Sequence, residues 1–257
     1  MMYVICIISF VASLLTFFSG FGLGTILLPI FLIFFPVTQA ITLTAIVHFL
    51  NNLFKISLIG NHIQWRVLFW FGFPAFLFAY LGARLLGIMA TSDPLIYQYL
   101  LFGKSFDIKL TKLIIAALMI VFTLLEYFPQ IKAIQIKTKN LWIGGLLSGF
   151  FGGLSGHQGA LRSMFLVRAK LTKESFIACG VAIAILIDIS RISVYFTEGM
   201  WTYWNTQRIP LLIATLSTLG GSLMGRILLK KINLIHVHRF VGAAIIVFSI
   251  AIGLGWI

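Results

Sequence analysis

One stretch of the sequence gathers side chains that could bind a ligand inside an otherwise apolar segment. Residues 148–163, "SGFFGGLSGHQGALRS", combine glycines with hydrogen-bond donors and contain no acidic residue. Where a helix stops and restarts, the first N–H groups of the new half-helix lack intrahelical partners and lie at the positive end of its dipole. A restart near Ala160 would therefore form an anion site. The donors predicted to surround the anion are Ser155, His157, Gln158, Arg162 and Ser163.

Glycines are predicted to interrupt two of the apolar segments, because glycine weakens a continuous helix and lets the backbone turn. In a bilayer, irregular backbone survives only where protein covers it or a water-filled cavity meets it. The alternative is that the glycines serve close packing between helices, which leaves His157, Gln158 and Arg162 unexplained. The predicted break residues are Gly20, Gly22 and Gly24 in the first segment, and Gly152, Gly153, Gly156 and Gly159 in the fifth.

A second group of polar residues lies in the segment at about 40–60. Its members are Thr44, His48, Asn51, Asn52 and Lys55, at spacings of three, four and seven that place them on one side of a helix. We predict that this side lines a water-filled pathway and that Asn51, Asn52 and Lys55 contact the substrate. Lys55 lies nearer the helix end, so its ammonium could instead reach the headgroup layer.

Asp188 is the acidic residue that lies near the middle of an apolar segment. A charged residue there costs roughly 2.5 to 3.5 kcal/mol, so it should face a partner or a wet cavity. Arg191 follows on the same helical face, and Tyr195 extends that face. Two interpretations remain: an ion pair that locks the bundle, or an Arg191 whose remaining donors bind substrate. For proton coupling, the candidates are His48, His157 and Asp188, whereas Na⁺ coupling would use Asp188 with backbone carbonyls.

The composition places all of these residues in a membrane. The chain of 257 residues is 60% hydrophobic and 10% charged, and its mean hydropathy is +1.07. Apolar runs long enough to span a bilayer, roughly 20 residues each, occupy most of the length. They lie at about 3–35, 40–60, 67–90, 111–128, 141–167, 174–197, 205–229 and 239–257. The predicted fold is an all-α polytopic membrane helix bundle of about eight transmembrane segments in one domain, 1–257.

The two halves of the chain resemble each other. "FFSGFG" at 17–22 corresponds to "LLSGFFGG" at 146–153, "NLFK" at 52–55 to "DISR" at 188–191, and "YLGARLL" at 80–86 to "SLMGRIL" at 222–228. The matches occur in the same order, which indicates homologous repeats at 1–130 and 140–257, each with a glycine-broken first helix. Internal repeats with interrupted helices are typical of secondary transporters, whose substrate site lies between the repeats.

Smaller features have simpler interpretations. The run 94–102 is too short to span and is predicted to be an interfacial helix, and Arg84 and Arg226 are predicted to anchor helix ends. The net charge of +13 is scattered through connections, which argues against nucleic acid and favours an orienting role. The two cysteines lie in apolar stretches and are predicted to be packing residues.

The chain resembles the sulfite exporter TauE/SafE family along nearly its whole length. The resemblance is carried by "SGFGLGTILLP" at 19–29, "GNHIQWR" at 60–66 and above all "GFFGGLSGHQGALRSMFLVRAKLTKESF" at 149–176. It implies a transporter, not an enzyme, that moves sulfite, sulfonates or related organosulfur anions across the cytoplasmic membrane. The first glycine run is thinner than in many members, which weakens the case for a two-fold symmetric site.

Two other functions are compatible with parts of the sequence. A passive anion channel could use the same donors to line a pore. An intramembrane protease is suggested by "GLSG" at 153–156, but its serine would need a histidine base on another helix. The expected partners are a small anion, the lipid bilayer and a coupling ion, H⁺ or Na⁺; a homodimer stays open. No cofactor, metal or nucleic acid is expected.

Overall fold

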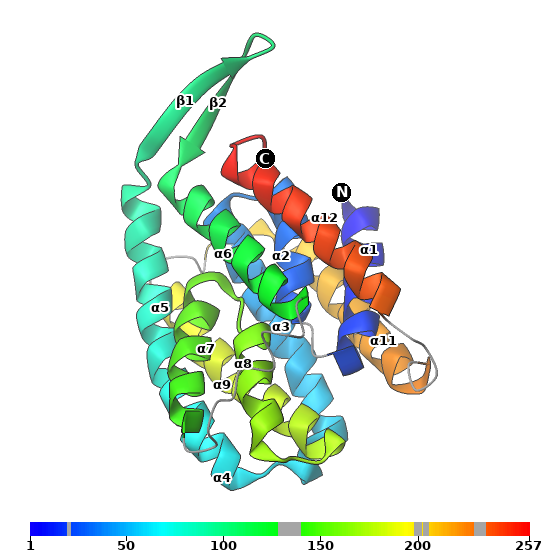
Figure 1. The fold of residues 1–257 in the computed structure, drawn as a ribbon. Coiled ribbons are helices and arrows are strands. Elements are labelled where there is room, and N and C mark those ends of the chain that lie inside the picture. The colour runs from blue at the N-terminus through cyan, green and yellow to red at the C-terminus, as the bar shows by residue number, and fades with distance from the viewer. Residues whose placement is uncertain (20–21, 128–139, 198–201, 203–205, 229–234) are drawn as a thin grey trace.

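The structure is a computed structural model of the whole chain, and it describes residues 1–19, 22–127, 140–197, 202, 206–228 and 235–257 (Figure 1). Most of these residues are helical, as the sequence predicts. The helices of the first half are α1 (Met2–Ser19), α2 (Leu23–Phe34), α3 (Val37–Ile59), α4 (Trp65–Val67), α5 (Phe73–Ser92) and α6 (Leu110–Tyr127). Those of the second half are α7 (Leu141–Ser155), α8 (Gly159–Leu166), α9 (Lys173–Thr197), α11 (Arg208–Leu228) and α12 (Ile235–Gly253).

Three helical stretches among the described residues are long and apolar enough to cross a membrane on their own. They are Val37–His62, Trp65–Ser92 and Lys173–Thr197. The second of these includes α4 and α5, which are joined by a π-helical turn at Leu68–Gly72. Shorter apolar helices accompany them. Among these, α1 and α2 together, and α7 and α8 together, occupy the two over-long segments that the sequence predicts to be interrupted.

A β-hairpin replaces the predicted interfacial helix at 94–102. Strand β1 (Leu95–Leu101) pairs antiparallel with β2 (Lys104–Lys109), and the hairpin projects beyond one end of the bundle (Figure 1). The all-α prediction is therefore wrong in this part of the chain. Phe102 and Gly103 both have positive φ, +50° and +75°, as the tight hairpin turn requires. Tyr99 and Phe106 pair across the strands with stacked rings, a contact that an isolated helix would not make.

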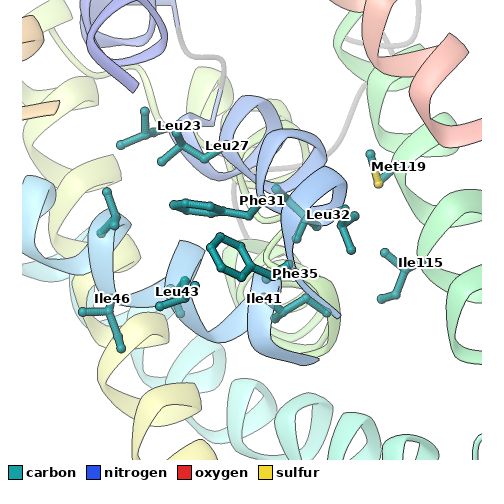
Figure 2. Close-up of a cluster of buried hydrophobic side chains, with 14 of the residues drawn as sticks. Leu23, Leu27, Phe31, Leu32, Phe35, Ile41, Leu43, Ile46, Ile115 and Met119 are labelled. Carbon is teal, nitrogen blue, oxygen red and sulfur yellow. The ribbon is translucent and has the colours of Figure 1, made fainter. Parts of the chain in front are cut away.

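The apolar core centres on α2, which is buried along most of its length (Figure 2). Phe31 and Phe35 pack with ring centroids 5.9 Å apart, between Leu43 of α3 and Met119 of α6. A helix that is apolar on every side needs neighbours on every side. The helix α2 therefore lies inside the bundle, and it holds the adjoining glycine break close to the middle of the protein.

Glycines bring two pairs of helices into backbone contact. A Cβ on Gly145, Gly149 or Gly153 of α7 would collide with a carbonyl oxygen of the α5 side, and a Cβ on Gly221 of α11 would collide with that of Phe10 in α1. Small residues at every fourth position allow this approach. The packing interpretation of the glycines is therefore correct for Gly153, which lies within α7 and contacts the carbonyl of Ala79.

Candidate functional site

The fifth apolar segment breaks between α7 and α8, slightly later than the sequence predicts. Gly152 and Gly153 still lie inside α7, which ends at Ser155, and α8 begins at Gly159. Gly156 takes the left-handed conformation at φ +82° and donates its N–H to the Gly152 carbonyl. Glycine is the residue that adopts this conformation without strain. The break is thus a left-handed helix end followed at once by a new helix start at Gln158.

The first break lies directly against the second. Gly22 caps the start of α2, and a Cβ placed on it would lie 3.9 Å from the Cα of Gly159. A Cβ on Gly24 would lie 3.4 Å from the carbonyl oxygen of Gly156. Gly20 lies outside the described residues. The two interruptions, distant in sequence, therefore meet in the interior of the bundle.

A small cavity of about 70 Å³ lies beside the meeting point of the breaks. Its walls come from α3, α8 and α9 together with the first break. Five of the predicted functional residues line it: His48, Asn52, Lys55, Arg162 and Ser163. Its other lining residues are Thr16, Gly22, Leu23, Leu166, Phe176, Ile177, Gly180 and Val181.

Two basic side chains give the cavity its charge. Lys55 is buried, and Arg162, on the facing helix α8, is half-buried and donates from Nη1 to Oε1 of Gln158 at 3.3 Å. None of the lining residues is acidic. Donors from Asn52 and Ser163 complete a set that is able to hold a small oxyanion, because charge-assisted hydrogen bonds are strongest where water is scarce.

Asp188 lies behind the cavity and is fully buried. Its Oδ2 is 2.6 Å from Nδ1 of His48, and its Oδ1 accepts a hydrogen bond of 2.9 Å from Nε of Arg191. Since Nδ1 of His48 donates to the carboxylate, Nε2 is the nitrogen that accepts from Nδ2 of Asn52, at 3.3 Å. The sequence suggests the Asp188 to Arg191 pair but not the contact with His48, which joins α3 to α9.

Arg191 does not line the cavity; its side chain makes contacts inside the helix bundle. The residue is buried completely, and its Nη1 donates to the Gly152 carbonyl at 3.3 Å, near the end of α7. Tyr195 donates from its hydroxyl to the carbonyl of Gly153 at 2.7 Å. The Gly152 carbonyl also accepts the N–H of Gly156, so Arg191 gives it a second donor. Tyr195 supplies a donor to a carbonyl in the last turn of α7, where intrahelical donors run out. The ion-pair interpretation of Arg191 is the one that this geometry favours.

Gln158 connects the buried ion pairs with the cavity. Its Nε2 lies 3.4 Å from Oδ1 of Asp188, while its Oε1 accepts from Arg162. The backbone carbonyl of Gln158 also accepts from the hydroxyl of Ser148 at 3.0 Å. The side chain is buried and does not line the cavity. It positions Arg162 instead of touching the space where an anion would lie.

Ser155 and His157 lie outside the cavity wall. The Ser155 hydroxyl donates to the carbonyl of Phe151 and lies 3.1 Å from Nδ1 of His157. Because the serine proton is directed at the carbonyl, His157 is the donor in their contact, which is the wrong direction for a general base acting on serine. The His157 ring stacks on Phe122, and its Nε2 has no partner among the described residues. This geometry does not support a protease site.

The predicted polar side of α3 divides into two parts. His48, Asn52 and Lys55 face the cavity. Asn51 points toward α1 and α11, where its amide joins the hydroxyls of Ser13 and Ser222. Thr44 returns its hydroxyl to the Ala40 carbonyl of its own helix, at 2.7 Å. Asn51 and Thr44 therefore hold helices together or satisfy backbone and are not placed to contact an anion.

Several cavity residues are not found by the sequence reasoning. Phe176, Ile177, Gly180 and Val181 of α9 line the cavity without any chemical signature. Thr16 is a hydroxyl at the end of α1 that a search for charged or strongly polar groups passes over. Among the described residues, no group of three or more histidines, cysteines and acidic residues is placed to hold a metal ion.

An apolar helix bundle with interrupted helices and a small cavity lined by basic side chains is the architecture of a membrane protein. The comparison with protein families identifies it further. The chain belongs to the sulfite exporter TauE/SafE family, whose sequence model matches residues 5–252. Membership confirms the resemblance and makes the protein a membrane transporter of sulfite-type anions. The search of curated proteins gave no match, and neither did the search of solved structures.

Proposed function

We propose that the protein is a secondary active transporter that carries small sulfite-type or organosulfur anions across the cytoplasmic membrane. The anion lies in the cavity between α3 and α8, held by Lys55, Arg162, Asn52 and Ser163. The observation that carries this proposal is the convergence of two basic side chains from opposite halves of the chain on one cavity without an acidic residue. Neither basic group makes such a site alone.

Alternating access needs two units that can move against each other, and the helix packing supports two repeats. The helix α1 packs along α11, and α7 packs along α5; α3 contacts α9, and α6 contacts α12. Exchanging each helix with its counterpart in the other half, α1 with α7, α3 with α9, α5 with α11 and α6 with α12, reproduces this pattern. We therefore propose eight crossings in two repeats, 1–130 and 140–257, with the cavity at their interface.

The coupling ion, H⁺ or Na⁺, is proposed to act through the buried network next to the anion. His48 touches both the cavity and Asp188, so a proton on its ring changes the charge beside the substrate. Arg191 already neutralises Asp188 from the other side. His48 is therefore the strongest of the candidate coupling residues. His157 is the weakest, since it does not line the cavity.

The test is flux of radiolabelled sulfite into proteoliposomes that contain the purified protein. Accumulation against a gradient, when a proton or sodium gradient is imposed, supports the carrier. Flux that never exceeds equilibrium and does not saturate with sulfite concentration would instead support the passive channel. Sulfate, taurine and carboxylates added as competitors define the substrate range.

Variants locate the site in the same assay. Lys55→Ala and Arg162→Ala should each abolish saturable sulfite uptake while the protein stays folded in detergent. Arg84→Ala, which removes an exposed arginine of α5, is the matched control and should transport normally. Arg191→Ala should instead lower stability, because it leaves the Asp188 carboxylate without its arginine. Normal uptake by both cavity variants would rule out the proposed site.

A further inference from the structure

A second cavity lies apart from the anion site, at the end of the bundle where α4 begins. It measures about 530 Å³ and shares no residue with the first cavity. In Figure 1, α4 lies at the end opposite the β-hairpin. The lining residues are Gln64, Arg66, Val67, Trp70, Leu141 and Trp142, with Ala169. One cation, two indoles and several aliphatic groups therefore surround it.

Arg66 is the charged residue of this cavity. Its side chain is exposed, and within the described part of the chain it makes no hydrogen bond or ion pair. No acidic residue lines the cavity. A guanidinium offers several donors in a planar fork that matches a phosphate or carboxylate. The cavity is thus suited to an anionic group, with apolar surface on its other sides.

The surroundings of the cavity indicate which kind of anion it binds. Along the outer face of α5 and the π-helical turn before it, large apolar side chains stand exposed; they include Phe69 at 62%, Phe73 at 55% and Leu77 at 46%. In a membrane protein such a surface faces hydrocarbon. Trp65, Trp70 and Trp142, all exposed, lie at its end, as expected of indoles at the headgroup level. The cavity therefore opens where acyl chains give way to headgroups.

We propose that this cavity binds the phosphate of an anionic membrane lipid. Arg66 holds the phosphate, the indoles of Trp70 and Trp142 flank the headgroup, and the acyl chains lie over Phe69 and Phe73. A free oxyanion would gain nothing from the aliphatic lining of Val67 and Leu141, whereas a lipid uses both parts. The neighbouring Lys170, exposed next to Ala169, adds positive potential toward an anionic bilayer surface.

Thermal unfolding of the purified full chain in detergent tests this proposal. Phosphatidylglycerol should raise the melting temperature of the wild type, while phosphatidylcholine, inorganic phosphate and sulfite should not reproduce the Arg66-dependent shift. Arg66→Gln should lose at least half of the phosphatidylglycerol shift, and Trp142→Ala should lose part of it. Arg226→Gln, an exposed arginine on α11 that lies outside this cavity, is the matched control and should keep the whole shift.

Native mass spectrometry gives a second readout that does not depend on stability. Wild-type protein and Arg226→Gln should retain one more phosphatidylglycerol molecule than Arg66→Gln. Equal retention by all three proteins, or an Arg66-dependent shift produced by inorganic phosphate alone, would overturn the proposal. Sulfite uptake does not enter either measurement, so a failure of the proposed transport function leaves this result interpretable.

Discussion

The helices α3 and α9 are counterparts in the two proposed repeats, but their charged residues have different neighbours. Lys55 follows Asn52 by three residues in α3, and Arg191 follows Asp188 by three in α9. In α9 the carboxylate neutralises the arginine, whose Nη2 lies 2.7 Å from it. In α3 the residue three positions before Lys55 is the uncharged Asn52, and both side chains line the cavity. The acid at 188 and the amide at 52 thus distinguish the arginine that pairs inside the bundle from the lysine that we propose binds the anion.

The two helix breaks differ in the same way. The first adjoins α2, whose sequence "LGTILLPIFLIF" has one hydroxyl and no charge. The second adjoins α8, which contributes Arg162 and Ser163 to the cavity. Both breaks supply glycine backbone at the place where they meet. Glycine backbone is thus common to both breaks, but of the two adjoining helices it is α8, not α2, that contributes charged and hydroxyl side chains to the cavity.

The largest expected effect is the loss of stability when the buried ion pair of Asp188 and Arg191 is broken. Asp188→Asn should destabilise the protein by about 3–5 kcal/mol, because Arg191 and His48 lose the carboxylate that they share in a buried site. Unfolding in detergent with increasing denaturant measures it. Glu174→Gln, an exposed acid at the start of the same helix, should change the midpoint little. Equal midpoints for the two variants would show that the ion pair does not lock the bundle.

The second prediction concerns the glycine contacts that pack α7 against α5 and α11 against α1, each joining a helix of one half of the chain to a helix of the other. Gly153→Ala should cost about 1–3 kcal/mol by overpacking against the Ala79 carbonyl. Gly221→Ala, at the contact of α11 with α1, should have a similar cost if the halves are packed alike. Gly60→Ala, whose Cβ would meet only Ile56 at 3.7 Å, is the control. Thermal melts in detergent measure all three. An unchanged melting temperature for Gly221→Ala would show that the two halves are not packed alike.

The third prediction converts α3 into the charge pattern of α9. Asn52→Asp should place a carboxylate beside Lys55 and lower the affinity for sulfite by roughly tenfold, a loss of about 1.4 kcal/mol. Calorimetric titration with sulfite measures it. Asn61→Asp adds the same charge at an exposed position past the end of α3 and should leave the affinity unchanged. Unaltered sulfite affinity in Asn52→Asp would show that Lys55 does not contact the anion.

The smallest effect is expected at Gln158, whose side chain contacts both the buried Asp188 and the cavity residue Arg162. Gln158→Leu removes the contacts with Asp188 and Arg162, each worth about 0.5–1.5 kcal/mol. The affinity for sulfite should fall severalfold, and the loss of stability should be smaller than that caused by Asp188→Asn. Gln39→Leu, also buried but away from the cavity, controls for the substitution itself. A loss of affinity equal to that of Arg162→Ala would mean that Gln158 contacts the anion directly.

Composition and glycine placement in the sequence predict the membrane class, the interrupted segments and the residue types of an anion site, because these depend on local chemistry. Lipid forces apolar segments to be helical, and glycine next to donors marks where a helix stops. The hairpin at 95–109 escapes this reasoning, since a short apolar run does not reveal its cross-strand partner.

Only the tertiary structure decided which polar side chains line the cavity and which ones join helices. Asn51 and Asn52 are neighbours in sequence, yet one joins the hydroxyls of Ser13 and Ser222 and the other lines the cavity. His48 and Asp188 are separated by 140 residues, and no local pattern connects them. Successive residues of a helix point about 100° apart, so the orientation of α3 among its neighbours decides which face meets the cavity, and packing between distant segments sets that orientation.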